Sequence, residues 1–143
     1  GKNGRNLAKF VTDFKQKSPE TKIRLMGHSL GAHVILSTIK NLAKSTKNKG
    51  IIEAVYLFGG SIPSDALSVK NASYAQKIVS TKIRNYYSPH DEVLHVVDDW
   101  NWVDTPIGYK GAHGKTIPKY SQTMVKPKNH RFASYAAVLR SFP

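Results

Sequence analysis

The sequence predicts an α/β fold built on a mostly parallel sheet of about four strands with flanking helices. Short apolar runs alternate along the chain with segments whose apolar residues recur at helical spacing. The run at residues 51–58 (IIEAVYLF) is apolar almost throughout, which is typical of parallel strands covered on both faces. Strands that alternate with helices favour parallel pairing through crossover connections.

The first half of the chain predicts two helices and two strands. Apolar residues at helical spacing indicate a first helix that ends at Pro19, namely Leu7, Phe10, Val11 and Phe14. The apolar run at residues 23–26 predicts a short strand. An apolar stripe over residues 32–43 predicts the second helix, and Gly50 ends it before the strand at residues 51–58.

The second half is expected to repeat this alternation with a long interruption. Residues 65–79 could hold a helix, and the run at residues 82–87 (KIRNYY) predicts a third strand that Pro89 stops. Residues 98–120 contain several glycines and prolines and are expected to form a long loop. A short strand at residues 122–125 and an amphipathic helix over residues 132–139 complete the prediction.

Length and composition limit the protein class. At 143 residues the chain is expected to form one domain, which spans residues 1–143. The sequence has no cysteine, so disulfides, thiolate metal sites and cysteine nucleophiles are excluded. It holds no apolar run of the ~20 residues that a membrane-spanning helix needs, and no signal peptide is visible. A cytosolic protein and a disulfide-free secreted protein both fit, and we favour the cytosolic location.

The formal net charge of +13 is large for this length. Such a charge can indicate a nucleic-acid partner or an anionic membrane surface. The lysines are spread along the chain, and no RNP-like, zinc-finger or helix-turn-helix signature accompanies them. We therefore expect a generally basic surface and no nucleic-acid partner, while an attraction to an anionic membrane surface stays open.

The segment Gly27-His28-Ser29-Leu30-Gly31 is the most informative motif in the chain. A G-x-S-x-G between a strand and a helix is the nucleophile elbow of an α/β-hydrolase, in which a sharp turn exposes the serine hydroxyl. Strand and helix then pass closely, so we expect Gly27 and Gly31 to fill positions that must be small. His28 is expected to pack beside the elbow.

A serine hydroxyl needs a base to take its proton, and the base needs a carboxylate to orient it. In α/β-hydrolases these partners follow in the order Ser, acid, His. Asp91 is the best candidate acid because it stands just past the predicted strand at residues 82–87, although an aspartate there could simply cap a turn or helix. Asp65, which follows the preceding strand, is the second candidate.

His130 is the best candidate base. It lies in a loop after a predicted strand and just before the last amphipathic helix. The alternatives are a surface histidine in a basic loop and, as a second candidate base, His113 in the glycine-rich loop. No cofactor or metal is expected, because this chemistry needs only side chains.

Ester cleavage also needs donors for the developing oxyanion. The backbone N–H of Leu30, at the start of a helix, is expected to be one of them. The second donor normally comes from a loop after an earlier strand. In this sequence no strand is predicted ahead of the one at residues 23–26 that leads into Ser29. The first predicted strand would then be an open edge, which an upstream segment or a partner chain is expected to cover.

The segments GHSLGAHVI, VYLFGGSIP, NYYSPHDEVL and KNHRFASY resemble the DUF726 family of α/β-hydrolases, which includes the TMCO-four-like membrane proteins. The elbow alone also looks like that of lipases. The resemblance implies a triad of Ser29, Asp91 and His130, and a chain that holds only the C-terminal part of the α/β-hydrolase fold. The family often has a glycine before its last histidine, where this chain has Asn129.

These observations predict a serine hydrolase that cleaves small acyl esters or lipids through an acyl-enzyme. In that hypothesis the loop with Trp100 and Trp102 forms a wall of an acyl pocket, a lid, or a simple hydrophobic cover of the sheet. The competing hypothesis is a catalytically impaired, hydrolase-like binding module that uses its basic surface or its open sheet edge.

Overall fold

The computed structural model describes residues 1–100 and 105–143. Its four strands form one all-parallel sheet in the order β1-β2-β3-β4, which confirms the predicted α/β fold class. The strands are β1 (Arg24–His28), β2 (Ile52–Phe58), β3 (Val79–Tyr87) and β4 (Tyr120–Met124). The helices are α1 (Lys2–Lys17), α2 (Gly31–Leu42), α3 (Ser73–Ile78), α4 (Glu92–Trp100), α5 (Ile107–Lys110) and α6 (Phe132–Ala137), with a 3₁₀ turn at Thr46–Asn48.

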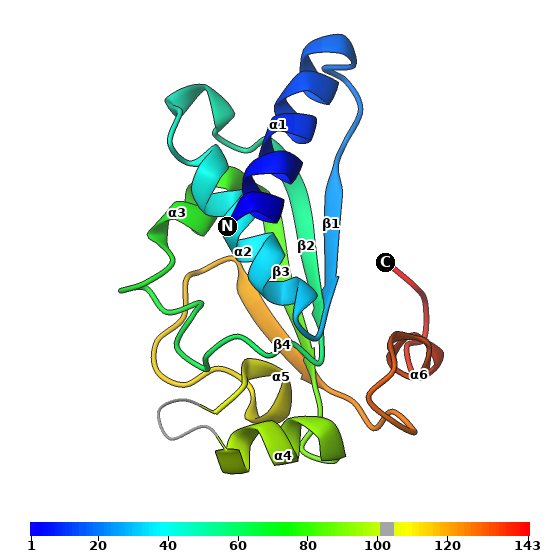
Figure 1. The fold of residues 1–143 in the computed structure, drawn as a ribbon. Coiled ribbons are helices and arrows are strands. Elements are labelled where there is room, and N and C mark those ends of the chain that lie inside the picture. The colour runs from blue at the N-terminus through cyan, green and yellow to red at the C-terminus, as the bar shows by residue number, and fades with distance from the viewer. Residues whose placement is uncertain (101–104) are drawn as a thin grey trace.

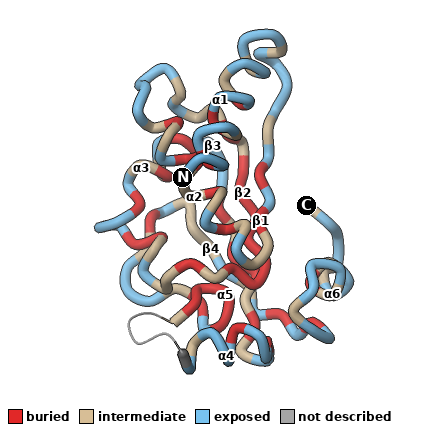
Figure 2. Tube along the Cα trace, viewed as in Figure 1, coloured by how far each residue is buried: buried red, intermediate tan, exposed pale blue. Residues whose placement is uncertain are grey.

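The sheet is covered differently on its two faces (Figure 1). Helices α1, α2 and α3 lie on one face, and side chains such as Leu25, Val55 and Ile83 form a core with them. On the other face, which we call the α6 face, Tyr56, Phe58 and Tyr86 pack with α6. Figure 2 shows that buried residues follow β2 through the centre of the molecule, as expected for a strand covered on both faces.

The register of the strands brings four loops to one edge of the sheet. His28 of β1 pairs with Phe58 of β2, and Phe58 pairs with Tyr86 of β3. Tyr87 then pairs with Met124 at the end of β4. Because the strands are parallel, the residues that follow each of them lie along the same rim, where α/β proteins bind ligands.

The expected long loop at residues 98–120 is wrong in two places. Helix α4 reaches Trp100, and α5 adds one helical turn over Ile107–Lys110. In α4 Leu94 is buried, whereas Val93, Val96 and Val97 are exposed. The helix expected within residues 65–79 is limited to α3, and β3 begins directly after it.

Two further expectations concern membranes and the loop tryptophans. In the part of the chain that the structure describes, no helix has the length and apolar character needed to cross a membrane. The expected wall or lid function of Trp102 lies outside the described residues, as does the side chain of Trp100.

Candidate active site

The turn from β1 to α2 has the backbone of a strained elbow. Ser29 has φ of 56°, a left-handed conformation that a residue with a side chain rarely adopts. Its N–H donates to the carbonyl of Phe58 at 3.1 Å, and its carbonyl accepts from the N–H groups of Ala32 and Ser61, each at 3.2 Å. Both neighbouring segments therefore hold the turn in place, which is how a strained residue persists in a folded protein.

The two glycines of the motif differ in their roles. A Cβ on Gly27 would lie 2.9 Å from Cγ1 of Ile35 and 3.1 Å from the carbonyl oxygen of Gly31, so this position must be small. A Cβ on Gly31 would meet nothing within 4 Å, so the expected steric need for glycine there is wrong. The close contact falls one residue later, where the Cβ of Ala32 lies 3.2 Å from the position that a Cβ on Gly60 would take.

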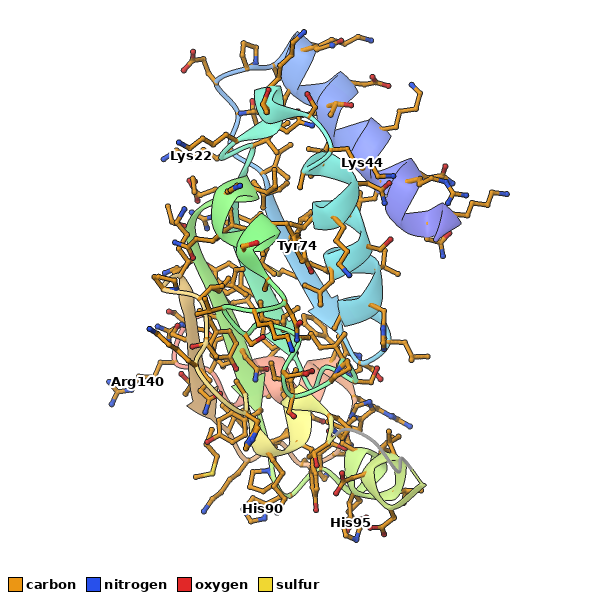
Figure 3. The ribbon with its side chains drawn as sticks, turned by 90° about the vertical axis from the view of Figure 1, so that its left-hand side faces the viewer. Lys22, Lys44, Tyr74, His90, His95 and Arg140 are labelled. Atoms are coloured by element: carbon orange, nitrogen blue, oxygen red, sulfur yellow. The ribbon has the colours of Figure 1, made fainter. Side chains whose placement is uncertain are left out.

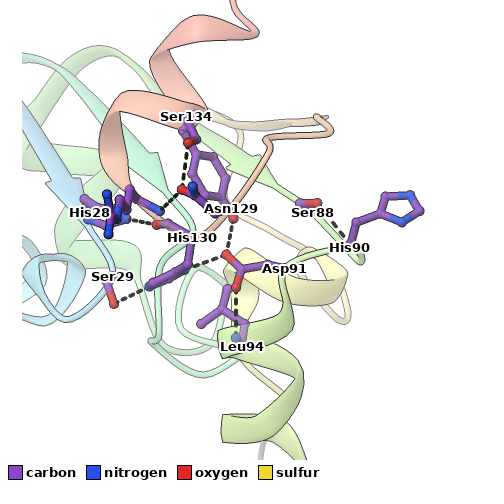
Figure 4. A network of polar contacts seen from close by, with 11 residues as sticks. His28, Ser29, Ser88, His90, Asp91, Leu94, Asn129, His130 and Ser134 are labelled. Carbon is purple, nitrogen blue, oxygen red and sulfur yellow. Dashed lines mark hydrogen bonds and ion pairs between the residues drawn. The ribbon is translucent and has the colours of Figure 1, made fainter.

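The structure brings the three predicted site residues together, from loops that follow β1, β3 and β4 (Figure 4). Nε2 of His130 lies 2.8 Å from Oγ of Ser29, and Nδ1 lies 2.5 Å from Oδ2 of Asp91. Because a carboxylate only accepts, Nδ1 carries the proton and Nε2 is free to accept from the serine hydroxyl. This is the arrangement of a Ser-His-Asp triad, although the catalytic roles of the residues stay a prediction.

Asp91 has two structural partners besides His130. Its Oδ1 accepts the backbone N–H of Leu94 at 2.9 Å, so it caps the start of α4, and its Oδ2 accepts the hydroxyl of Tyr135 at 2.5 Å. Burial acts to raise the pKa of Asp91, but hydrogen bonds from His130, Tyr135 and the Leu94 backbone together hold that pKa below its ordinary value. The carboxyl group is therefore ionised at neutral pH.

Tyr135 is a site residue that the sequence analysis missed. Its side chain is fully buried beside the carboxylate, and burial, followed by the hydrogen bond to Asp91 and then the charge of Asp91, raises the pKa of Tyr135 well above its ordinary value. The phenol thus stays protonated and donates. Its spacing in the last amphipathic helix indicated only a core residue, and the sequence carried no signal that its hydroxyl faces Asp91.

His28 has a larger role than packing beside the elbow. Its Nε2 donates to the backbone carbonyl of His130 at 2.5 Å, and the two rings lie 4.9 Å apart. Asn129 supports the same loop, because its side-chain oxygen accepts from the N–H of Arg131 at 2.9 Å and from the hydroxyl of Ser134 at 2.7 Å. These contacts fix the backbone of His130, so the ring points toward Ser29.

The N–H of Leu30 lies at the start of α2, as expected for one oxyanion donor. It has no hydrogen-bond acceptor within residues 1–100 and 105–143, and helix α2 places its positive dipole end there. The side chain of Leu30 is 72% exposed, which leaves the approach to Ser29 bordered by an apolar group.

The alternative candidates do not join this network. Asp65 and His113 are both exposed, and they lie in the segments between β2 and α3 and between α5 and β4. Of the residues that the structure describes, no group of three or more His, Cys, Asp or Glu side chains is arranged to hold a metal ion.

Comparisons with known proteins give a family but no activity. The model of a family described as "Protein of unknown function (DUF726)" matches residues 1–105, which confirms the resemblance to this family. The match contains Ser29 and Asp91 and stops before His130. A relative from Oryza sativa subsp. japonica, named "Transmembrane and coiled-coil domain-containing protein STS1", is 35% identical over 97 residues. These residues are 66% of this chain and only 14% of that relative, and no solved structure matches.

Proposed function

The chain belongs to the DUF726 family, whose description assigns no function, and we propose that it is a serine hydrolase that cleaves carboxylic esters through Ser29, His130 and Asp91. The observation that carries this proposal is the continuous chain of contacts from Oγ of Ser29 through His130 to Asp91, at 2.8 and 2.5 Å. The strained φ of Ser29 supports it, because such strain is typical of functional turns. We further propose that the domain corresponds to the C-terminal part of an α/β-hydrolase fold.

In the first half of the proposed reaction, Oγ of Ser29 attacks the ester carbonyl carbon while Nε2 of His130 takes the hydroxyl proton. The negative charge of Asp91 stabilises the imidazolium that forms. The oxyanion of the tetrahedral intermediate accepts a hydrogen bond from the N–H of Leu30. The intermediate collapses, the alkoxide leaves with the proton from Nε2, and the acyl group stays on Ser29.

The second half removes the acyl group by the same route. His130 takes a proton from a water molecule, and the hydroxide attacks the acyl carbonyl carbon. The carbon–oxygen bond to Ser29 then breaks, and Ser29 regains its proton from Nε2. The products are a carboxylic acid and the free enzyme.

The exposed Leu30 beside the nucleophile favours an apolar acyl group. In α/β-hydrolases the second oxyanion donor comes from a loop after an earlier strand, and we propose that it is supplied here by an upstream segment or a partner chain that also covers the free edge of β1. Removal of one donor typically lowers kcat by about 10²–10³. The isolated chain is therefore expected to be slow rather than inactive.

A fluorophosphonate probe tests the proposal, because it reacts only with an activated serine. We expect covalent labelling that mass spectrometry maps to Ser29 and that is lost in Ser29→Ala and after heat unfolding. Ser80→Ala is the matched control, because Ser80 is exposed near the start of β3 and should label like the wild type. Absence of labelling in the folded protein would instead favour the binding module that uses the basic surface or the β1 edge.

A further inference from the structure

A groove lies on the α6 face of the sheet, between β4 and the segment that follows α6. Its volume is about 550 Å³. Its basic side chains come from three segments, namely Arg84 of β3, Lys126 after β4 and Arg140 after α6. Figure 3 shows Arg140 beside β4, away from α1 and α2. Cations that are far apart in the sequence thus meet at one depression.

Arg84 is held in a position that leaves donors available. One guanidinium nitrogen, Nη1, donates to Oγ1 of Thr123 at 3.1 Å, and the guanidinium also lies by the phenol of Tyr86, whose pKa it acts to lower. A guanidinium has five N–H donors in a planar fork, so most of them remain for a ligand. The bond to Thr123 orders the side chain before any ligand binds, which lowers the entropic cost of binding.

The charge of the groove has no internal neutralisation. No described Asp or Glu lines it, and none of Arg84, Lys126 and Arg140 pairs with an acidic residue in residues 1–100 and 105–143. The hydroxyl of Ser141 also borders the groove and can donate. An arginine fork, two further cations and a hydroxyl donor match the oxygens of a phosphate group.

The rim of the groove is apolar. Met124 is 52% exposed and Val138 is 42% exposed, and both line the same depression as the cations. A free phosphate ion would gain nothing from such side chains, whereas an amphiphile would bury them. We propose that this groove binds the phosphate headgroup of an anionic phospholipid, with Met124 and Val138 against the adjoining apolar part of the lipid.

This site is separate from the triad, and its proposal does not depend on the chemistry of Ser29. Lys126 and Arg140 contact none of the three triad side chains through hydrogen bonds or ion pairs among the described residues. The groove would hold the domain against an anionic bilayer whether or not the protein hydrolyses esters.

Sedimentation with vesicles of phosphatidylcholine containing phosphatidic acid tests the proposal. Lys126→Gln/Arg140→Gln removes two exposed cations from the groove, and Lys44→Gln/Lys47→Gln removes the same charge from exposed positions near the end of α2. The groove variant should bind these vesicles about thirtyfold more weakly at physiological salt. The control should lose less than about threefold, because charges beyond a Debye length of ~8 Å are screened. Both variants should keep the melting temperature of the wild type.

The remaining outcomes would each overturn the proposal. Equal loss in both variants would assign the binding to net charge alone. If the wild type does not bind these vesicles, or binds pure phosphatidylcholine vesicles equally well, an anionic phospholipid is excluded as the ligand of the groove. If inorganic phosphate at millimolar concentration displaces the protein from the vesicles, the groove is a site for free phosphate. Cleavage of a soluble ester, measured in parallel, should be unchanged in the groove variant, which separates this test from that of the proposed hydrolase.

Discussion

The substitution Tyr135→Phe would test how the buried carboxylate at the site is held. It removes the hydroxyl that donates to Oδ2 of Asp91 at 2.5 Å and leaves the ring, which is fully buried, in place. A hydrogen bond to a charged group contributes about 1.5–3 kcal/mol. We therefore expect the free energy of unfolding at pH 7 to fall by about 2 kcal/mol, which lowers the melting temperature by roughly 8 °C for a chain of this size.

The loss should depend on pH in a defined direction. The pKa of Asp91 is depressed in the folded state, so its ionised form stabilises the fold above the unfolded pKa of about 3.9 and this stabilisation disappears as pH falls through the folded pKa. Tyr135 is one cause of that depression, so Tyr135→Phe raises the pKa of Asp91. The difference between the two proteins should be constant above about pH 5 and shrink below about pH 4.

Urea unfolding between pH 3 and pH 8 measures this difference. Tyr74→Phe is the matched control, because the pKa of Tyr74 is raised by burial alone and its hydroxyl bonds to no described residue. That control should change stability by less than about 0.5 kcal/mol at every pH. An equal loss for Tyr135→Phe at pH 3 and pH 7 would refute the bond to an ionised Asp91, and so would no loss at pH 7.

Three further predictions concern the elbow and the buried phenols. The free energy of unfolding of Ser29→Gly should be about 1 kcal/mol higher than that of Ser29→Ala, because glycine adopts a φ of 56° without strain. Equal midpoints of urea unfolding for the two variants would contradict this. Gly27→Ala should lower the free energy of unfolding by about 2 kcal/mol or more, while Gly31→Ala, whose Cβ meets nothing within 4 Å, should be neutral or slightly stabilising in the same assay. Burial raises the pKa of Tyr74 and of Tyr120 to about 12, so stability should be intact below about pH 10 and fall as pH rises toward 12. Tyr120→Phe should reduce that fall in unfolding experiments between pH 9 and pH 12.

The second helix and the strand at residues 51–58 were predictable because their apolar patterns match burial, whereas Phe10 and Phe14 of the first helix are exposed. The stripe of the second helix and the run at residues 51–58 face the core, as the pattern required. Helix α4 was not predictable in the same way. Its valines face solvent, and its start depends on a cap from Asp91, a residue for which the sequence leaves both a capping and a catalytic role open. The carboxylate in fact makes both contacts, one with each oxygen.

The candidate site was predictable where a local rule or chain order applied. The elbow motif identified Ser29, and the order Ser, acid, His selected Asp91 and His130, which the structure places in contact. The contacts of Tyr135 and His28 could not be predicted, because they depend on how α6 and the loop before it return to the rim of the sheet. The predicted steric need for glycine at position 31 was wrong, because a Cβ there meets nothing within 4 Å, and the tight contact between strand and helix is that of Gly27 with Ile35.

The distance along the chain between Ser29 and His130 has a consequence for synthesis on the ribosome. The nucleophile leaves the exit tunnel about a hundred residues before its base, a delay of roughly 5–20 s at the usual elongation rate. The parallel strand β4 must also pair with β3 before the loop bearing His130 reaches the rim. Under the proposed chemistry, a nascent or truncated chain is latent, and onset of esterase activity reports that the last strand has docked.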